Sequence, residues 1–264
     1  MSFLNQVIWI TGASSGIGKE LAILLSKESC NLILSSRNKE SLELVKRECA
    51  TPKNIYILPL DLEEHSVFEL KVTEAIQAFG KIDMLINNGG ISQRSLAEDT
   101  GFSVDKRIMD INYLGTVGLS KAVLPHFIKN NRGHFVVTTS IVGKIGTPFR
   151  SSYAASKHAL HGFFDSLRAE TYKKNIIVTL VCPGFVNTDI SKNALTGNGS
   201  PQGKLDKATG KGMSPKRFAI LMIKAIENRK EEVYISGVKE KLGVYVKRFF
   251  PRLFSKLVRK IPVT

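Results

Sequence analysis

The chain has 264 residues, 43% of them hydrophobic, so it can bury one sizeable core, and we expect a single domain over residues 1–264. Its first apolar run, Val7–Ile10, is too short to cross a membrane, and its three cysteines are scattered, which argues against a targeting segment and a disulfide framework. Neither the cysteines nor the five histidines show a metal-binding spacing. We therefore expect a cytoplasmic protein without a metal. The net charge of +15 bears on partners rather than on fold.

Strand and helix patterns alternate along the chain. In order they are strand Val7–Thr11, helix Gly16–Lys27, strand Asn31–Ser35, helix Lys39–Glu48, strand Ile55–Leu60, helix Val67–Phe79, strand Ile82–Asn87, a helical region over Asp105–Asn130, strand His134–Ser140, a helix carrying Tyr153, strand Ile176–Cys182, helix Lys216–Asn228 and strand Glu232–Ser236. Short apolar strands separated by amphipathic helices predict a Rossmann-type, doubly wound α/β sheet of about seven parallel strands with helices on both faces. Ligands of such sheets bind beyond the carboxyl ends of the strands.

Residues 187–213 interrupt this alternation, because they are rich in Gly, Ser, Thr and Lys and have no apolar period. A segment of this length is either a lid or a disordered loop. We expect it to be a substrate loop.

A glycine-rich turn joins the first strand to the first helix, with Gly12, Gly16 and Gly18 in the spacing GxxxGxG. Glycines permit a tight turn and let backbone amides and a helix amino end face a pyrophosphate. A glycine turn can also serve packing alone, but the strand before it and the helix after it favour cofactor binding.

The second strand ends in Ser36-Arg37. An acidic residue at this point would bind an adenosine ribose and repel a 2′-phosphate, whereas a cation would attract that phosphate. The sequence therefore predicts NADP(H) rather than NAD(H). The alternative is that Arg37 is only a surface charge before a helix.

Tyr153 and Lys157 lie four residues apart in a helical pattern, so they share one face. A nearby cation stabilises a phenolate and lowers the pKa of the tyrosine, as a general acid/base requires. Ser140 ends the preceding strand, so its hydroxyl can reach the same substrate oxygen. An isolated YxxxK match would more often be an exposed tyrosine beside a snorkelling lysine.

Several motifs fall in register with the strands: Thr11-Gly12-xxx-Gly16-Ile-Gly18, Asp61, Asn87-Asn88-Gly89-Gly90, Asn112, Ser140, Tyr153-xxx-Lys157 and Pro183-Gly184. Together they resemble the short-chain dehydrogenase/reductase family. The runs NNGGISQRSL, INYLGTVGLSKAVLPH and YAASKHALHGFF look most like its member 7 branch, whose relatives are often membrane-associated and linked to retinoid or steroid carbonyls. The amino-terminal membrane segment of those relatives is not seen here.

The resemblance implies a catalytic set of Asn112, Ser140, Tyr153 and Lys157. It also implies a cofactor site made of Gly12, Ser14, Ser15, Gly16, Ile17, Gly18, Ser36, Arg37, Asp61, Leu62, Asn88, Gly89, Tyr153, Lys157, Pro183, Gly184, Val186 and Thr188. In this scheme Lys157 holds the nicotinamide ribose and Asn112 holds a water. Taken alone, Asn112 would be a structural amide, Asp61 a helix cap and Thr188 a solvated side chain. The family usually has Ala where Gly89 stands.

The substrate side is assigned to Ser140, Tyr153, Phe149 and Phe185, with Ile91, Ile141, Val142 and Val186 nearby. Such apolar residues favour a lipophilic substrate, although they could equally be core. The sequence thus predicts an NADP(H)-dependent oxidoreductase that interconverts an alcohol and its ketone or aldehyde on a steroid-, retinoid- or lipid-like molecule. By family habit it would be a homodimer or homotetramer. The alternative is an NADP(H)-binding sensor or scaffold without significant turnover.

Residues 238–264 form a basic amphipathic extension with eight Lys or Arg against Glu240 alone, divided by Pro251. Two short helices lying on an anionic bilayer, as in a peripheral membrane protein, are one hypothesis. Packing of the apolar side over the substrate cleft or a neighbouring subunit is the other. Nucleic acid is disfavoured, because the tail shows no recognised module.

Overall fold

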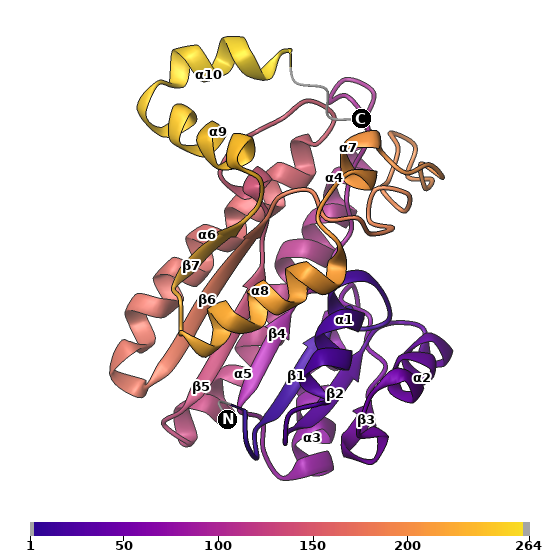
Figure 1. Cartoon of the computed structure of the whole chain (residues 1–264), viewed down its shortest axis with the longest axis vertical. Coiled ribbons are helices and arrows are strands. Elements are labelled where there is room, and N and C mark those ends of the chain that lie inside the picture. The colour runs from indigo at the N-terminus through magenta and orange to yellow at the C-terminus, as the bar shows by residue number, and fades with distance from the viewer. Residues whose placement is uncertain (1–2, 261–264) are drawn as a thin grey trace.

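The computed structural model describes residues 3–260, which form one parallel sheet in the strand order β3-β2-β1-β4-β5-β6-β7 (Figure 1). The strands are β1 (Val7–Thr11), β2 (Asn31–Ser35), β3 (Ile55–Ile57), β4 (Met84–Asn87), β5 (Gly133–Thr138), β6 (Ile176–Pro183) and β7 (Glu232–Ile235). The helices are α1 (Gly16–Leu25), α2 (Lys39–Glu48), α3 (Phe68–Phe79), α4 (Phe102–Met109), α5 (Thr116–Lys129), α6 (Ser151–Thr171), α7 (Lys207–Gly210), α8 (Pro215–Glu227), α9 (Val238–Phe249) and α10 (Pro251–Val258). The predicted seven-stranded, doubly wound fold is confirmed.

Alternate side chains of the sheet enter two cores, one on each face. In β1, Ile8 and Ile10 join the core beneath α1, α2 and α8, whereas Val7 and Trp9 join the core beneath α3, α5 and α6. Both faces are therefore apolar, which explains why the strands look like continuous hydrophobic runs in the sequence.

Strand β3 is shorter than predicted for a local reason, whereas the other strands begin and end within two residues of their predicted bounds. Strand β3 ends at Ile57 instead of Leu60, because Pro59 has no N–H to donate to the ladder, although Leu58 N still donates to Leu34 O at 3.0 Å. The predicted helical region over 105–130 is confirmed, and it consists of α4 and α5 with a π-helical turn, Asp110–Gly115, between them. A Cβ at Gly115 would lie 2.3 Å from Leu62 O, so only glycine allows this turn to approach the loop after β3.

Residues 187–213 pack against the body of the protein, and we call this segment the lid. Leu195 bridges to Gln93 and Val186 to Met213, and Ala194 and Leu195 are buried. The only helix within the segment is the short α7.

The basic extension forms α9 and α10, which Pro251 separates by starting the second helix. Phe254 is buried in a small cluster with Ile141, Ile145 and Cys182, so one side of the pair packs on the protein itself. Among the described residues 3–260, no helix is both long enough and apolar enough to cross a membrane.

Candidate active site

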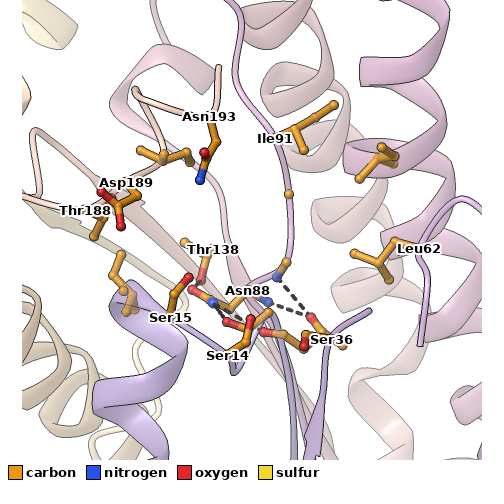
Figure 2. A pocket seen from close by; sticks show the side chains of 18 of the residues that line it. Ser14, Ser15, Ser36, Leu62, Asn88, Ile91, Thr138, Thr188, Asp189 and Asn193 are labelled. Atoms are coloured by element: carbon orange, nitrogen blue, oxygen red, sulfur yellow. Dashed lines mark hydrogen bonds between the residues drawn. The ribbon is translucent and has the colours of Figure 1, made fainter. Parts of the chain in front are cut away.

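A pocket of about 370 Å³ lies beyond the carboxyl ends of the strands. It is lined by the glycine turn, the ends of β2, β4, β5 and β6, the loop after β3, the first turns of α6 and the beginning of the lid. Figure 2 shows how Ser15, Asn88, Thr188 and Asn193 meet around it. All the predicted cofactor residues except Gly18 line this one pocket.

Close backbone packing shapes the glycine turn. Gly12 has a φ of 63°, and a Cβ there would lie 2.8 Å from Gly89 Cα. A Cβ at Gly18 would lie 2.2 Å from Gly12 O, so Gly18 supports the turn from behind rather than lining the pocket. Asn88 holds the turn from β4, because its Nδ2 donates to Thr11 O at 3.3 Å and to Gly12 O at 3.4 Å. The first turn of α1 is thereby presented to the pocket, as a pyrophosphate requires.

Ser36, Arg37, Asp61 and Leu62 line the end of the pocket expected for the adenosine. Arg37 is exposed and lines the pocket. The next residue, Asn38, also lines the pocket and caps α2, because its side chain accepts a hydrogen bond from Ser41 N at 2.7 Å. Asp61 Oδ1 accepts from Glu63 N at 3.0 Å. This bond closes a turn and caps no helix, because the next helical turn, His65–Val67, has Glu64 as its N-cap residue. Of the two alternatives for Asp61, the structure therefore does not support the helix cap, and it places the side chain at the pocket.

Tyr153, Lys157 and Ser140 all line the same pocket and are all buried. Tyr153 shares a side-chain hydrogen bond with Ser140, whose Oγ also accepts from Val142 N at 3.1 Å. Lys157 Nζ lies 5.8 Å from the centroid of the Tyr153 ring and donates to Thr138 O at 2.8 Å. The phenol, the hydroxyl and the ammonium therefore converge as the sequence predicted.

The electrostatics of this group differ from the sequence-based expectation. Burial lowers the pKa of Lys157 to about 8. Burial raises the pKa of Tyr153, while the hydrogen bond with Ser140 and the charges of Arg150 and Arg94 act to lower it. The cations that oppose the desolvation of Tyr153 are thus two arginines that sequence reasoning missed, and Lys157 is not among them.

Asn112 is fully buried in the π-helical turn and does not line the pocket. Its Oδ1 accepts from Ile91 N at 2.8 Å, and its Nδ2 donates to Ile91 O at 2.9 Å and to Ser156 Oγ at 3.1 Å. It therefore ties the loop after β4 to the helix that carries Tyr153 and Lys157. Of the two sequence-based alternatives, the geometry of this structure supports the structural amide.

Gln93 caps the amino end of α6, a role with no sequence signal. Its side chain is fully buried, and its Oε1 accepts from Ser152 N at 2.9 Å and from Tyr153 N at 3.4 Å. Arg150, the residue before the helix, makes no side-chain cap bond. The amide of Gln93 thus replaces a local cap and fixes the turn that holds Tyr153.

The lid is joined to this site through Asp206. Arg94 Nη2 lies 2.6 Å from Asp206 Oδ2, Arg150 Nη2 lies 3.7 Å from the same oxygen, and all three side chains are buried. Burial acts to raise the pKa of Asp206, but hydrogen bonds from Arg94 and Gln202 outweigh it and the pKa is lowered. The ion pair between Arg94 and Asp206 therefore holds the lid to the loop that carries Gln93.

The predicted substrate residues Phe149 and Phe185 do not line the pocket. Phe149 adopts a φ of 64°, and the ring of Phe185 lies 5.5 Å from the Arg150 guanidinium. Sequence reasoning could not place them, because both lie in loops whose direction depends on tertiary contacts. The pocket is also lined by Thr11 and Gly90, which belong to the predicted motifs, and by residues that were not predicted: Ser35, Asn38, Leu60, Ile111, Thr138, Thr139, Asp189, Ile190 and Asn193.

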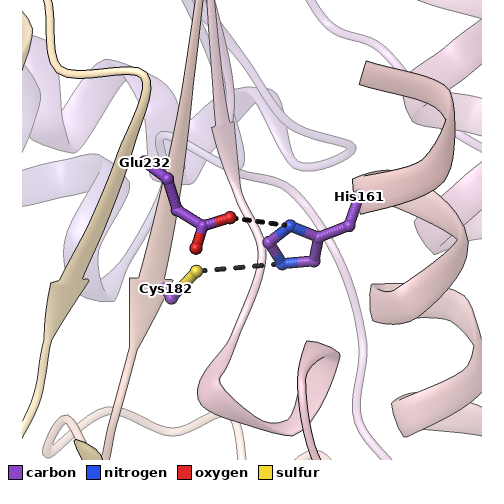
Figure 3. Close-up of side chains that lie close together, drawn as sticks. All are labelled: His161, Cys182 and Glu232. Carbon is purple, nitrogen blue, oxygen red and sulfur yellow. Dashed lines mark hydrogen bonds and ion pairs between the residues drawn. The ribbon is translucent and has the colours of Figure 1, made fainter. Parts of the chain in front are cut away.

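A second polar cluster, behind the pocket, joins His161, Cys182 and Glu232 (Figure 3). Lys144 Nζ lies 2.7 Å from Glu232 Oε2, and Tyr234 donates to Glu232 Oε1. Burial raises the pKa of Cys182 to about 12, so its thiol stays protonated. Because the carboxylate is already paired with an ammonium and the thiol keeps its proton, the cluster ties β7 to α6 rather than presenting ligands to a cation.

Residues 6–199 match the family model for short chain dehydrogenases, so the chain belongs to the short-chain dehydrogenase/reductase family. Among curated proteins, it is 41% identical to dehydrogenase/reductase SDR family protein 7-like of Drosophila melanogaster, over 97% of this chain and 80% of that protein. It is 43% identical to family member 7 of Homo sapiens, over 94% of this chain and 75% of that protein. The resemblance to the member 7 branch is confirmed.

Solved structures agree in fold. Levodione reductase has a TM-score of 0.81 at 24% identity, covering 90% of this chain and 99% of that one. A short-chain dehydrogenase/reductase from Burkholderia phymatum, in complex with NAD, has a TM-score of 0.84 at 21% identity, covering 96% of each chain. At these identities the likeness concerns the fold.

Proposed function

We propose that this oxidoreductase uses NADP(H) to interconvert an alcohol and its ketone or aldehyde, with Tyr153 as the general acid/base. The observation that carries the proposal is that Tyr153, Ser140 and Lys157 lie on the wall of the same pocket as the glycine turn of α1. The cofactor supplies or accepts the hydride when bound. The residues of the chain handle the proton and the oxygen.

In the direction of reduction, the Tyr153 hydroxyl donates its proton to the substrate oxygen, and Ser140 Oγ helps to orient that oxygen. The raised pKa of Tyr153 keeps the phenol protonated at neutral pH, which suits an acid. Lys157 would hold the nicotinamide ribose. In the direction of oxidation, the phenolate is needed, so this direction is favoured at higher pH.

The choice of NADP(H) rests on Ser36 and Arg37, because no acidic residue stands at the end of β2 to repel a 2′-phosphate. The NAD in the Burkholderia phymatum structure concerns that protein. The test is Arg37→Asp, which should weaken NADPH binding at least about tenfold and NADH binding much less. Arg132→Asp, an exposed arginine before β5, is the matched control and should change neither. Equal affinities of the Arg37 variant and wild type for NADPH would exclude this role.

A lipophilic substrate is favoured because Ile91, Ile111, Val186 and Ile190 are among the residues that line the pocket. NADPH oxidation should be measured with a panel of steroid, retinoid and lipid-derived ketones and aldehydes beside small polar carbonyls. Turnover of the polar compounds alone would contradict the assignment.

The alternative is a sensor or scaffold that binds NADP(H) without significant turnover. Tyr153→Phe distinguishes the two, because it removes the proton donor and leaves the ring. For an enzyme, NADPH binding should persist while turnover falls at least about a hundredfold. A wild-type protein that binds NADPH but turns over none of the panel would favour the sensor.

We expect a homodimer or homotetramer formed through the outer sides of α5 and α6, as is common in the family. Light scattering of the purified chain tests this.

A further inference from the structure

The outward side of α9 carries an apolar stripe. Val238, Leu242, Tyr245 and Phe249 follow one another at intervals of four, three and four residues, so they share one face of the helix. Their exposed fractions are 83, 59, 55 and 68%. A stripe with this spacing is normally the buried side of a helix, and here it faces outward.

Helix α10 extends the same surface, because Phe250, Leu253 and Leu257 are 63, 49 and 48% exposed. We call these seven side chains the α9–α10 apolar face. Phe254, which lies one turn from Phe250 and Leu257 on the same side of α10, anchors the pair, because it is buried in a cluster with Ile141 and Ile145. The protein's own packing therefore covers Phe254 and leaves the seven side chains of the α9–α10 apolar face 48–83% exposed.

The two helices stand beyond the carboxyl ends of β6 and β7, at the top left of Figure 1. The side chain of Glu240 links α9 to the chain segment Gly184–Phe185, of which Gly184 lines the pocket. Glu240 Oε1 accepts from Phe185 N at 3.0 Å, and Glu240 Oε2 accepts from Gly237 N. Gly184, which lines the pocket, lies so close that a Cβ there would be 2.6 Å from Glu240 Oε1.

The same segment also carries eight cations: Lys239, Lys241, Lys247, Arg248, Arg252, Lys256, Arg259 and Lys260. Glu240 is the only acidic residue of α9 and α10, and its two oxygens are used in the bonds to Phe185 and Gly237. If a second copy of the chain docked on this face, its cations would lie against the cations of the first copy, and their repulsion would oppose association. A surface that is apolar and negatively charged matches both properties.

We propose that the α9–α10 apolar face docks on an anionic lipid bilayer, with its apolar side chains in the headgroup region and its cations against acidic lipids. Since Glu240 ties α9 to the Gly184–Phe185 segment, docking holds the mouth of the pocket close to the bilayer. The inference does not depend on catalysis, because it uses residues outside the reacting group.

The test is sedimentation of the full chain with vesicles of phosphatidylcholine, with and without phosphatidylserine. Binding should need phosphatidylserine and fall steeply at high salt. The double variant Leu242→Ser/Phe249→Ser should reduce the partition coefficient at least about tenfold. Leu70→Ser/Phe102→Ser, whose residues are 66 and 82% exposed on α3 and α4, is the matched control and should bind like wild type.

The cations are tested by Arg248→Glu/Arg252→Glu, which should abolish binding, against Lys216→Glu/Lys224→Glu on the exposed side of α8, which should leave it nearly unchanged. Three results would overturn the proposal: no binding of wild type to the acidic vesicles, equal losses in test and control pairs, or a dimer that Leu242→Ser/Phe249→Ser converts to a monomer without any vesicle binding. Binding is measured without substrate, so an inactive protein would count against the proposed function and not against docking.

Discussion

Replacement of Lys157 by Met should stabilise the protein while it abolishes activity. Burial lowers the pKa of Lys157 from 10.5 to about 8. Since one pKa unit corresponds to about 1.4 kcal/mol, keeping this ammonium charged costs the fold about 3 kcal/mol at pH 7. Loss of the bond from Lys157 Nζ to Thr138 O offsets about 1–2 kcal/mol of the gain. The variant should therefore be more stable by about 1–2 kcal/mol, or about 3–6 °C in Tm.

The extra stability of the Lys157→Met variant should depend on pH in a defined window. The folded pKa of Lys157 lies below the unfolded value, so between pH 8 and 10.5 the unfolded chain keeps a proton that the folded protein has lost. The stability of wild type therefore rises with pH across this window relative to the variant. The advantage of Lys157→Met should be full below pH 8 and should shrink as the pH approaches 10.5.

Thermal unfolding of the cofactor-free proteins at pH 7 and at pH 9.5 measures both effects. Lys121→Met, at an exposed position of α5, should differ from wild type by less than about 0.5 kcal/mol at either pH. A Lys157→Met protein that is less stable than wild type by the same amount at both pH values would refute the reasoning. NADPH-dependent turnover should fall at least about a hundredfold.

Three further substitutions test the site. Gln93→Leu leaves two backbone amides of α6 without their acceptor and should lower the free energy of unfolding in urea by about 2–4 kcal/mol. Gln93→Glu keeps the acceptor and should recover most of this stability. Equal stability of the Leu and Glu variants would disprove the role of Gln93 as a cap. Asp206→Ala separates the lid from Arg94 and should cost about 3–5 kcal/mol, with faster proteolysis within residues 187–213; a wild-type cleavage rate would contradict this. Gly18→Ala forces the turn to shift and should weaken NADPH binding at least about tenfold by fluorescence titration. Gly162→Ala, where a Cβ meets nothing within 4 Å, should bind normally; parallel losses would rule out the steric argument.

The periodic parts of the sequence were sufficient to predict the sheet and its helices. Val7–Thr11, Asn31–Ser35 and Lys39–Glu48 were predicted with their observed bounds, because side-chain burial repeats with the period of the element. The prediction failed where one residue interrupts a regular pattern, because Pro59 shortens β3. The sequence also did not show that the predicted helical region over 105–130 contains a π-helical turn, Asp110–Gly115.

The sequence by itself determined the fold class, the family, and the placing of the glycine turn, Ser140, Tyr153 and Lys157 at one sheet edge, since parallel strands all end at that edge. Only the tertiary structure decided that Gln93 caps the helix of Tyr153, that Asp206 joins the lid to Arg94, and that Phe149 and Phe185 lie outside the pocket. The physical reason is that these contacts join polar groups far apart in the chain. Their partners are fixed by how loops pack, and such packing leaves no periodic trace in the sequence.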